Sequence, residues 1–276
     1  MKTGVFYALI LAFAIASAAC ASNRENGNGK IITKSISVND YNSITIGKGI
    51  EHNEKAFRFN NSKRSPRFEY KQVKGNAFLE ITIDENLLPL LDIQSSGSKL
   101  LIETKDGYHI NPSELMIKGT SRDLNYLSST SIMDFYIYDS FTTDQLQINI
   151  SGAGDIKIKD RADIKSFKVD VSGAGDIEVK NLICDTFDGL IRGAGDLDLK
   201  GKAERATYYV SGAGDVNAYE FAVKDLACKV SGAGDLKVYA TEYLDATVSG
   251  TGDIHYKGNP QAKTKVSGFG DIEKVK

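Results

Sequence analysis

Aspartate recurs at a regular spacing along most of this chain, and a row of carboxylates is the first feature that suggests chemistry. Each aspartate closes a five-residue motif, which first reads Ser151-Gly152-Ala153-Gly154-Asp155. Later copies, spaced by 18 to 21 residues, end at Asp176, Asp196, Asp215, Asp235, Asp253 and Asp271. Carboxylate oxygens are good ligands for Ca²⁺. The candidates for a metal row are therefore Asp155, Asp176, Asp196, Asp215 and Asp235.

A structural role in turns is the alternative for these aspartates, and we favour it. A calcium site needs several oxygens converging on one ion, whereas one aspartate per repeat supplies few. Aspartate also favours turns because its carboxylate accepts hydrogen bonds from nearby backbone N–H groups. Lysines that follow the motifs offer partial neutralisation of the row: Lys157, Lys159, Lys180, Lys200, Lys237 and Lys257. We expect no metal and no cofactor.

The other residue types that catalyse reactions or bind metals show no informative spacing. His52, His109 and His255 are scattered along the chain. The Gly-x-Gly of the motif is not a nucleotide loop, because no helix and no Lys-Ser/Thr pair follow it. Cys184 and Cys228 are expected to be free, buried thiols. The sequence therefore predicts no catalytic residues.

Strands on both sides of the motif must position the aspartates. The residues one, three and five places before each motif are apolar in nearly every copy, as in Ile150, Ile148 and Leu146. The residues one and three places after the aspartate continue the alternation, as in Ile156 and Ile158. A period of two on each side of a turn indicates strand, turn, strand. Units of about 20 residues without a helix bury their apolar faces by stacking, which predicts an all-β, parallel β-helix.

The two glycines of each motif are predicted to serve the turn. A corner between two faces of a coil needs a positive φ or a close approach of neighbouring coils, and glycine permits both. These structural glycines are Gly152, Gly154, Gly173, Gly175, Gly193, Gly195, Gly212, Gly214, Gly232, Gly234, Gly250, Gly252, Gly268 and Gly270.

The first residues have the features of a bacterial export signal. Lys2 precedes an apolar run over residues 5–16, which is too short to span a bilayer. Small residues then precede Cys20, as in a lipoprotein cleavage site. We therefore expect a signal peptide at 1–19, a lipid on Cys20 and, from its polar composition, a flexible tether over residues 20–35.

The rest of the chain is predicted to form one continuous solenoid with two parts. Irregular N-terminal coils occupy residues 36–128, and regular repeats occupy residues 129–276. Ser129-Thr130-Ser131 is interpreted as an eroded copy of the motif, 22 residues before the first complete one. The open edge of the last coil carries charges, Glu273 and Lys274 among them, that disfavour edge pairing. We expect a monomer or a weak oligomer.

Ligand recognition is expected at outward positions beside the motif. Tyr219 and Tyr239 lie four residues after their aspartates, in equivalent positions, and form a possible ligand face. Exposed tyrosines would suit a glycan or a surface protein, and ordinary packing against loops is the alternative. A formal net charge of −2 without a basic block gives no indication of nucleic-acid binding.

Three features together resemble the family described as putative auto-transporter adhesin, head GIN domain. They are the repeated Ser-Gly-x-Gly-Asp motif, the stretch 244–260 and the closing stretch 266–272. The resemblance covers roughly residues 36–274 and is strongest over 145–274. It implies a right-handed parallel β-helix and a cell-envelope lipoprotein similar to those of Bacteroidetes.

The resemblance transfers no catalytic residues, because the family has none established. This chain departs from the family pattern at Ser129-Thr130-Ser131, which lacks the glycines, and at Arg192, where serine is usual. Those departures concern local turns.

We expect an exported, lipid-anchored protein of the outer membrane or cell surface, on its periplasmic or extracellular side. Its adhesin-like function would be the binding of a glycan or protein without catalysis. The alternative is a carbohydrate-active enzyme of the β-helix type, a polysaccharide lyase or hydrolase, which only analogy of fold supports.

Overall fold

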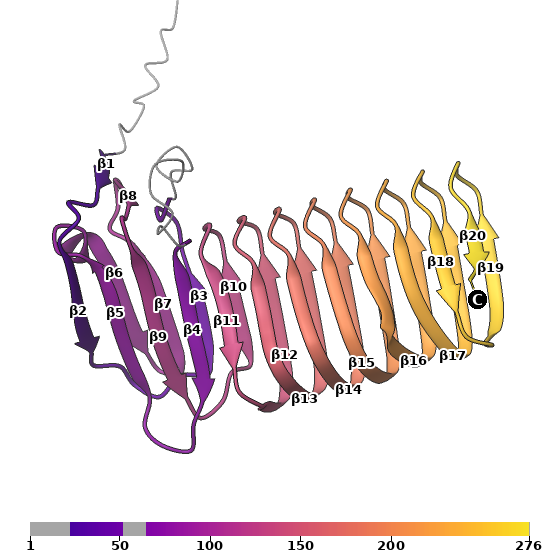
Figure 1. Ribbon diagram of the computed structural model, residues 1–276, viewed down its shortest axis with the longest axis horizontal. Coiled ribbons are helices and arrows are strands. Elements are labelled where there is room, and N and C mark those ends of the chain that lie inside the picture. Colours follow the sequence, from indigo (N-terminus) through magenta and orange to yellow (C-terminus); the bar gives the residue numbers. More distant parts are fainter. Residues whose placement is uncertain (1–22, 52–64, 276) are drawn as a thin grey trace, which may run out of the picture.

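The chain folds into a single elongated stack of β-strand coils (Figure 1). The fold was obtained as a computed structural model, which describes residues 23–51 and 65–275. Eighteen strands join one continuous sheet, and a two-stranded sheet pairs β1 with β8. Among the described residues the only helix is the single 3-10 turn η1 (Leu88–Leu90). The predicted all-β solenoid of parallel stacked coils is confirmed.

The regular coils begin at β10 and continue to the last strand. Their strands are β10 (Tyr126–Ser129), β11 (Asp134–Tyr138), β12 (Phe141–Ile150), β13 (Ile156–Val171), β14 (Ile177–Ile191), β15 (Leu197–Val210), β16 (Val216–Val230), β17 (Leu236–Val248), β18 (Ile254–Lys257), β19 (Gln261–Val266) and β20 (Ile272–Lys274). Each coil pairs in parallel with the next, so equivalent residues form columns. The motif turns lie along one edge, the upper edge in Figure 1.

The core of the regular coils consists of the alternating apolar residues predicted from the sequence. Ile148, Ile150, Ile156 and Ile158 are all at most 1% exposed. Their spacing of two puts every second side chain inside, because successive residues of a strand point to opposite faces. The apolar faces of neighbouring coils thus share one continuous core.

Gly189 is an exception among the inward positions, and its neighbour explains it. Gly189 pairs in register with Tyr208 of the next coil, whose side chain is 2% exposed. A methyl group on Gly189 would lie 2.9 Å from the ring of Phe187 and 3.2 Å from the ring of Tyr208. The missing side chain therefore provides the volume that the buried tyrosine fills.

The motif glycines are required by close coil contacts and not by a positive φ. Positive φ angles occur at other glycines, such as Gly201 and Gly258, and at none of the motif glycines. A Cβ on Gly175 would overlap the carbonyl oxygen of Gly154 in the preceding coil, and Gly173 meets Gly152 in the same way. Of the two reasons expected from the sequence, close approach is the one that applies.

The eroded copy of the motif lies one residue later than we predicted. Ser129 pairs with Ile150, so Thr130 is the residue equivalent to Ser151. Ser131 and Met133 then take the places of the two glycines, and Asp134 takes the place of the aspartate. This copy of the motif has lost its glycines and kept its aspartate. Because the other copies are recognised by their glycines, the sequence alone did not give its correct register.

The N-terminal part closes one end of the solenoid. Its strands are β1 (Asn23–Asn26), β2 (Ile31–Ile36), β3 (Ser43–Ile46), β4 (Arg67–Gln72), β5 (Phe78–Asp84), β6 (Leu91–Ser96), β7 (Lys99–Thr104), β8 (Tyr108–Asn111) and β9 (Leu115–Ser121). The strands β3 and β4 stack in parallel on β10 and β11 of the first regular coil. Beyond them, β5 pairs antiparallel with both β2 and β9. The strands of this part thus do not stack in the order of the chain.

The predicted flexible tether over residues 20–35 is wrong for its described part. Asn23–Asn26 forms a strand with β8, and Ile31–Ile36 forms a strand with β5. The side chains of Thr33 and Thr82 share a hydrogen bond of 2.9 Å across that pair. A polar composition hid these strands because they cover the end of the core from outside and need few apolar residues. Cys20 and the signal peptide lie outside the described residues.

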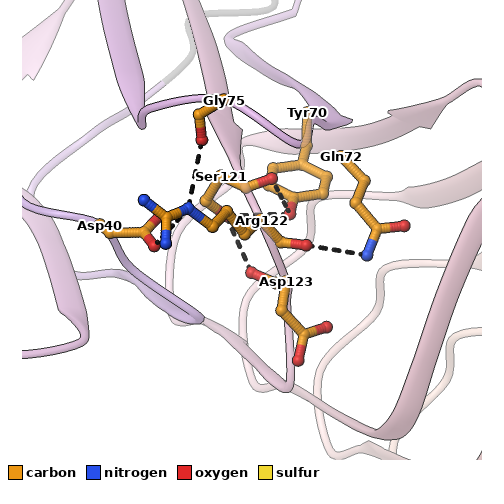
Figure 2. Close-up of polar contacts among 7 residues, drawn as sticks. All are labelled: Asp40, Tyr70, Gln72, Gly75, Ser121, Arg122 and Asp123. Atoms are coloured by element: carbon orange, nitrogen blue, oxygen red, sulfur yellow. Dashed lines mark hydrogen bonds and ion pairs between the residues drawn. The ribbon is translucent and has the colours of Figure 1, made fainter.

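A polar network within the N-terminal part, shown in Figure 2, extends through Gln72 to Thr142 of the regular coils. Arg122 lies between Asp40, at 3.3 Å, and the carbonyl oxygen of Gly75, at 3.4 Å. The Gln72 amide donates to the Arg122 carbonyl at 3.0 Å and to the Thr142 carbonyl at 2.8 Å. It also accepts the Thr142 backbone N–H at 3.0 Å. The network therefore fixes β4 against β12.

No helix in the described part of the chain has the length and apolar character needed to cross a membrane.

Candidate ligand-binding site

The motif aspartates form a hydrogen-bonded ladder along the edge of the solenoid. The Oδ1 atom of each accepts the backbone N–H of the equivalent aspartate in the next coil, over distances of 2.7 to 3.1 Å. The ladder starts at Asp134 and ends at Asp271, whose Oδ1 accepts the N–H of Ile272 at 2.7 Å. The carboxylates do accept backbone N–H groups, as predicted, but all except Asp271 do so across coils and not within their own turn.

Asp134, at the start of this ladder, is a half-buried carboxylate. Burial raises the pKa of Asp134, and the N–H of Asp155 partly opposes that shift by stabilising the charged form. The candidates for a metal row each accept a backbone N–H group instead, namely Asp155, Asp176, Asp196, Asp215 and Asp235. Across the described ranges, no group of three or more His, Cys, Asp or Glu side chains is placed to hold a metal ion.

The lysines after the motifs have varied partners. Lys157 lies 3.3 Å from Asp155. Among the described residues, it is the only one of these lysines that forms an ion pair with a motif aspartate. Lys180 pairs with Glu178 at 3.6 Å, and Lys200 pairs with Glu220 at 2.9 Å. Charge neutralisation of the column by lysine is therefore limited to its N-terminal end, and hydrogen bonds from the backbone serve the rest.

Tyr219 and Tyr239 lie in adjacent coils beside Lys257 of the coil after them. The Lys257 ammonium is 4.7 Å from the centre of the Tyr239 ring and 5.9 Å from that of Tyr219. Both tyrosines are half-buried. The sequence thus located a real cluster, in which a lysine of the protein itself already contacts the aromatic rings.

The histidines in the described residues each lie beside a carboxylate, and the two cysteines are buried in the core. His109 lies 2.9 Å from Glu51, and His255 lies 3.9 Å from Glu273, while His52 is outside the described residues. Cys184 and Cys228 are both free and buried, as predicted. Burial raises the pKa of the Cys184 thiol to about 12, and it raises that of Cys228 as well. Thiols held protonated in this way are poor nucleophiles.

An open groove of about 670 Å³ crosses the C-terminal coils on the strands that precede the motifs. We call this sheet surface the groove face and define it by the outward residues of β12 to β17 and β19 that come before each motif. The groove is lined by Arg205, Ala206, Thr207, Asp225, Leu226, Ala227, Tyr243, Leu244, Asp245, Gln261, Ala262 and Lys263. Its volume lies in the range of small-molecule sites.

One wall of the groove is a column of four exposed side chains. Arg205, Asp225, Tyr243 and Gln261 are register partners in four successive coils. No hydrogen bond or ion pair involves any of these four side chains within the described part of the chain. Tyr243 is 54% exposed. Exposed donors and acceptors that are not engaged by other side chains, beside an exposed aromatic ring, are suited to contact a polar ligand.

The neighbouring column supplies the floor and the opposite wall. Thr207, Ala227, Asp245 and Lys263 occupy equivalent positions. Lys263 pairs with Asp245 at 2.9 Å, and Thr207 donates to Asp188 of the preceding coil at 2.5 Å. The small side chain of Ala227 leaves the hollow between them.

The sequence did not single out these residues. They occupy outward positions where the repeat varies most, as the column Gln145, Ser166, Thr186, Arg205, Asp225, Tyr243 and Gln261 illustrates. A signal was present, since an arginine, a tyrosine and an aspartate replace small polar residues in the later copies. Register alignment of the outward positions would have brought it out.

Comparison with known proteins agrees with the motif and the fold. The family model of the putative auto-transporter adhesin, head GIN domain, matches residues 64–178 and 148–260, which is more than half of the chain. The chain belongs to this family. Membership in the head GIN domain family supports an adhesin-like protein associated with the cell surface or envelope.

Several solved structures share the fold over nearly the whole chain. A putative lipid binding protein from Parabacteroides distasonis is 29% identical, with a TM-score of 0.83 over 92% of this chain and 100% of that one. A putative adhesin from Parabacteroides merdae is 29% identical, with a TM-score of 0.80 over 92% and 99%. A putative adhesin from Parabacteroides distasonis is 27% identical, with a TM-score of 0.78 over 92% and 100%. A search of curated proteins found no match.

Proposed function

We propose that this head GIN domain protein is a lipid-anchored adhesin of the cell envelope that binds glycans in the groove without catalysis. The observation that carries the proposal is the column of exposed side chains, Arg205, Asp225, Tyr243 and Gln261, along one wall of an open groove. An aromatic ring can cover the apolar face of a sugar, while the charged and amide groups bind its hydroxyls.

A glycan suits this surface better than an extended peptide. Peptides that bind sheets do so mainly through main-chain hydrogen bonds at an open edge. Across the groove the backbone groups between β15, β16, β17 and β19 are already used, since these strands pair with one another in parallel. Only side chains point toward a ligand, so hydroxyl-rich sugars have the matching chemistry.

The groove also favours a polar ligand over a lipid tail. One similar structure is described as a putative lipid binding protein. In this chain four charged side chains line the groove, namely Arg205, Asp225, Asp245 and Lys263. An acyl chain would remove water from these charges without giving them hydrogen bonds, which costs free energy.

The proposal predicts that Tyr243→Ala weakens glycan binding about fivefold or more, because stacking on an aromatic ring contributes of the order of 1 kcal/mol. Binding is measured by titration calorimetry with the best glycan from an array probed with the purified protein. The matched control is Tyr239→Ala, which removes a tyrosine from another surface of the same coil. Unchanged binding in Tyr243→Ala together with a loss in Tyr239→Ala would assign recognition to the Tyr219–Tyr239 cluster instead.

The same samples distinguish the enzyme alternative. Asp225 and Asp245 both line the groove, and hydrolases of polysaccharides use pairs of carboxylates. We expect the glycan to be recovered intact after long incubation, as measured by mass spectrometry. Shorter products that disappear in Asp225→Asn would replace the binding role with a catalytic one.

A further inference from the structure

A second depression adjoins the groove on the same sheet surface. It encloses about 270 Å³ and its lining includes Gln147, Lys168, Asp188, Thr207 and Tyr209. Thr207 lines both the depression and the groove. The two hollows therefore meet at this residue and form one track.

The register shows in which direction the track runs. Gln147, Lys168, Asp188 and Thr207 pair successively from β12 to β15. The same column continues through Ala227, Asp245 and Lys263 in the next three coils. The track thus crosses the strands and follows the long axis of the solenoid (Figure 1). Seven coils about 4.8 Å apart give it a length of roughly 30 Å.

The second depression has the same kinds of side chain as the groove. Tyr209 lines it and is 36% exposed, with the Lys229 ammonium 5.4 Å from its ring centre. Lys168 has no hydrogen bond or ion pair among the described residues. Asp170, at its border, is held by two bonds from Arg192 at 2.6 and 2.8 Å. An aromatic ring and a free cation are thus present in both hollows.

Resting on the proposed function, we infer that the ligand is a linear oligosaccharide that lies lengthwise along this track. Its sugars would contact Tyr243 in the groove and Tyr209 in the second depression. The coil spacing of about 4.8 Å is close to the size of one sugar ring, so successive coils offer successive subsites. A short sugar fills the groove alone, whereas a longer chain reaches both hollows.

The test is a length series of cellooligosaccharides, chitooligosaccharides and oligogalacturonides of about two to eight sugars, titrated against the whole folded protein. We expect affinity to rise with length until the track of roughly 30 Å is filled, and then to level off. We expect Tyr209→Ala to weaken the longest oligomers at least about fivefold and to leave the shortest ones unchanged. Tyr243→Ala should weaken all lengths.

The outcomes separate this inference from the proposed function. Affinity independent of length, or full affinity of Tyr209→Ala for the longest oligomers, would overturn the lengthwise track and leave a short glycan site. Absence of binding at every length would overturn the proposed function as well. Tyr138→Ala, which changes a tyrosine outside the groove face, serves as the control, and melting temperatures show that each variant is folded.

Discussion

At the scale of single residues, the motif glycines show how a solenoid restricts side-chain volume at its corners. Gly175 has no positive φ, yet a Cβ at this position would overlap the Gly154 carbonyl oxygen of the preceding coil. The restriction is set by backbone atoms, which cannot move aside as the end of a flexible side chain can. Only residues without a side chain fit where one regular coil stacks this closely on the regular coil before it.

Gly175→Val should therefore destabilise the protein by about 2 kcal/mol or more, because overpacking against fixed backbone forces the two coils apart. Denaturant unfolding measures the loss. Ala174→Val is the control, since Ala174 is exposed in the same turn and should change stability by less than about 0.5 kcal/mol. Equal effects of the two substitutions would show that the turn tolerates volume at both positions.

At the scale of elements, the aspartate ladder gives each turn its register. Asp196 accepts the N–H of Asp215 at 2.8 Å and offers its own N–H to Asp176. Two effects oppose each other here. Carboxylates about 4.8 Å apart repel by roughly 1 kcal/mol for each of the two neighbours in water, and salt screens part of this repulsion, whereas loss of a hydrogen bond to a charged acceptor costs about 1.5–3 kcal/mol. The hydrogen bond is thus expected to prevail.

Substitution of Asp196 tests this balance. Asp196→Ala should lower the free energy of unfolding by about 1 kcal/mol, because the Asp215 N–H loses its acceptor. Asp196→Asn keeps an acceptor oxygen and removes the charge, so it should lose less than half as much. Both are measured by urea unfolding. If alanine were as stable as aspartate, repulsion would cancel the hydrogen bond and the ladder would contribute only to register.

At the scale of the whole molecule, the N-terminal strands determine how the solenoid would be presented on a membrane. The first described residue, Asn23, already belongs to β1 at the closed end of the stack. A lipid on Cys20 would be only three residues away, a reach of about 10 Å. The closed end would then lie against the membrane, and the groove, on the side of the C-terminal coils, would be held at the far end of the solenoid. The monomeric or weakly oligomeric state stays a prediction.

Cys20→Ser should abolish incorporation of labelled palmitate and release the protein from the membrane fraction, because the thiol that accepts the lipid is gone. Metabolic labelling and cell fractionation measure both effects. Cys184→Ser is the control, since that thiol is buried in the core. Labelling that persists in Cys20→Ser would contradict the anchor, while glycan binding by the purified protein would be unaffected.

The sequence by itself determined the regular part of this fold. Alternation on both sides of each Gly-x-Gly-Asp turn places Ile148, Ile150, Ile156 and Ile158 inside, and a repeat of about 20 residues forces stacking because one coil cannot bury its own face. These are local patterns that every copy repeats. The family resemblance followed from the same residues.

Only the tertiary structure decided where the N-terminal strands pair and where the outward side chains meet. The antiparallel strands β2 and β5 close the end of the core, and no sequence repeat indicates that they pair with each other. Arg205, Asp225 and Tyr243 are about 20 residues apart in sequence and become neighbours through register alone. Outward positions are free of packing constraints, so they vary between copies, and their chemistry emerges only when the coils are stacked.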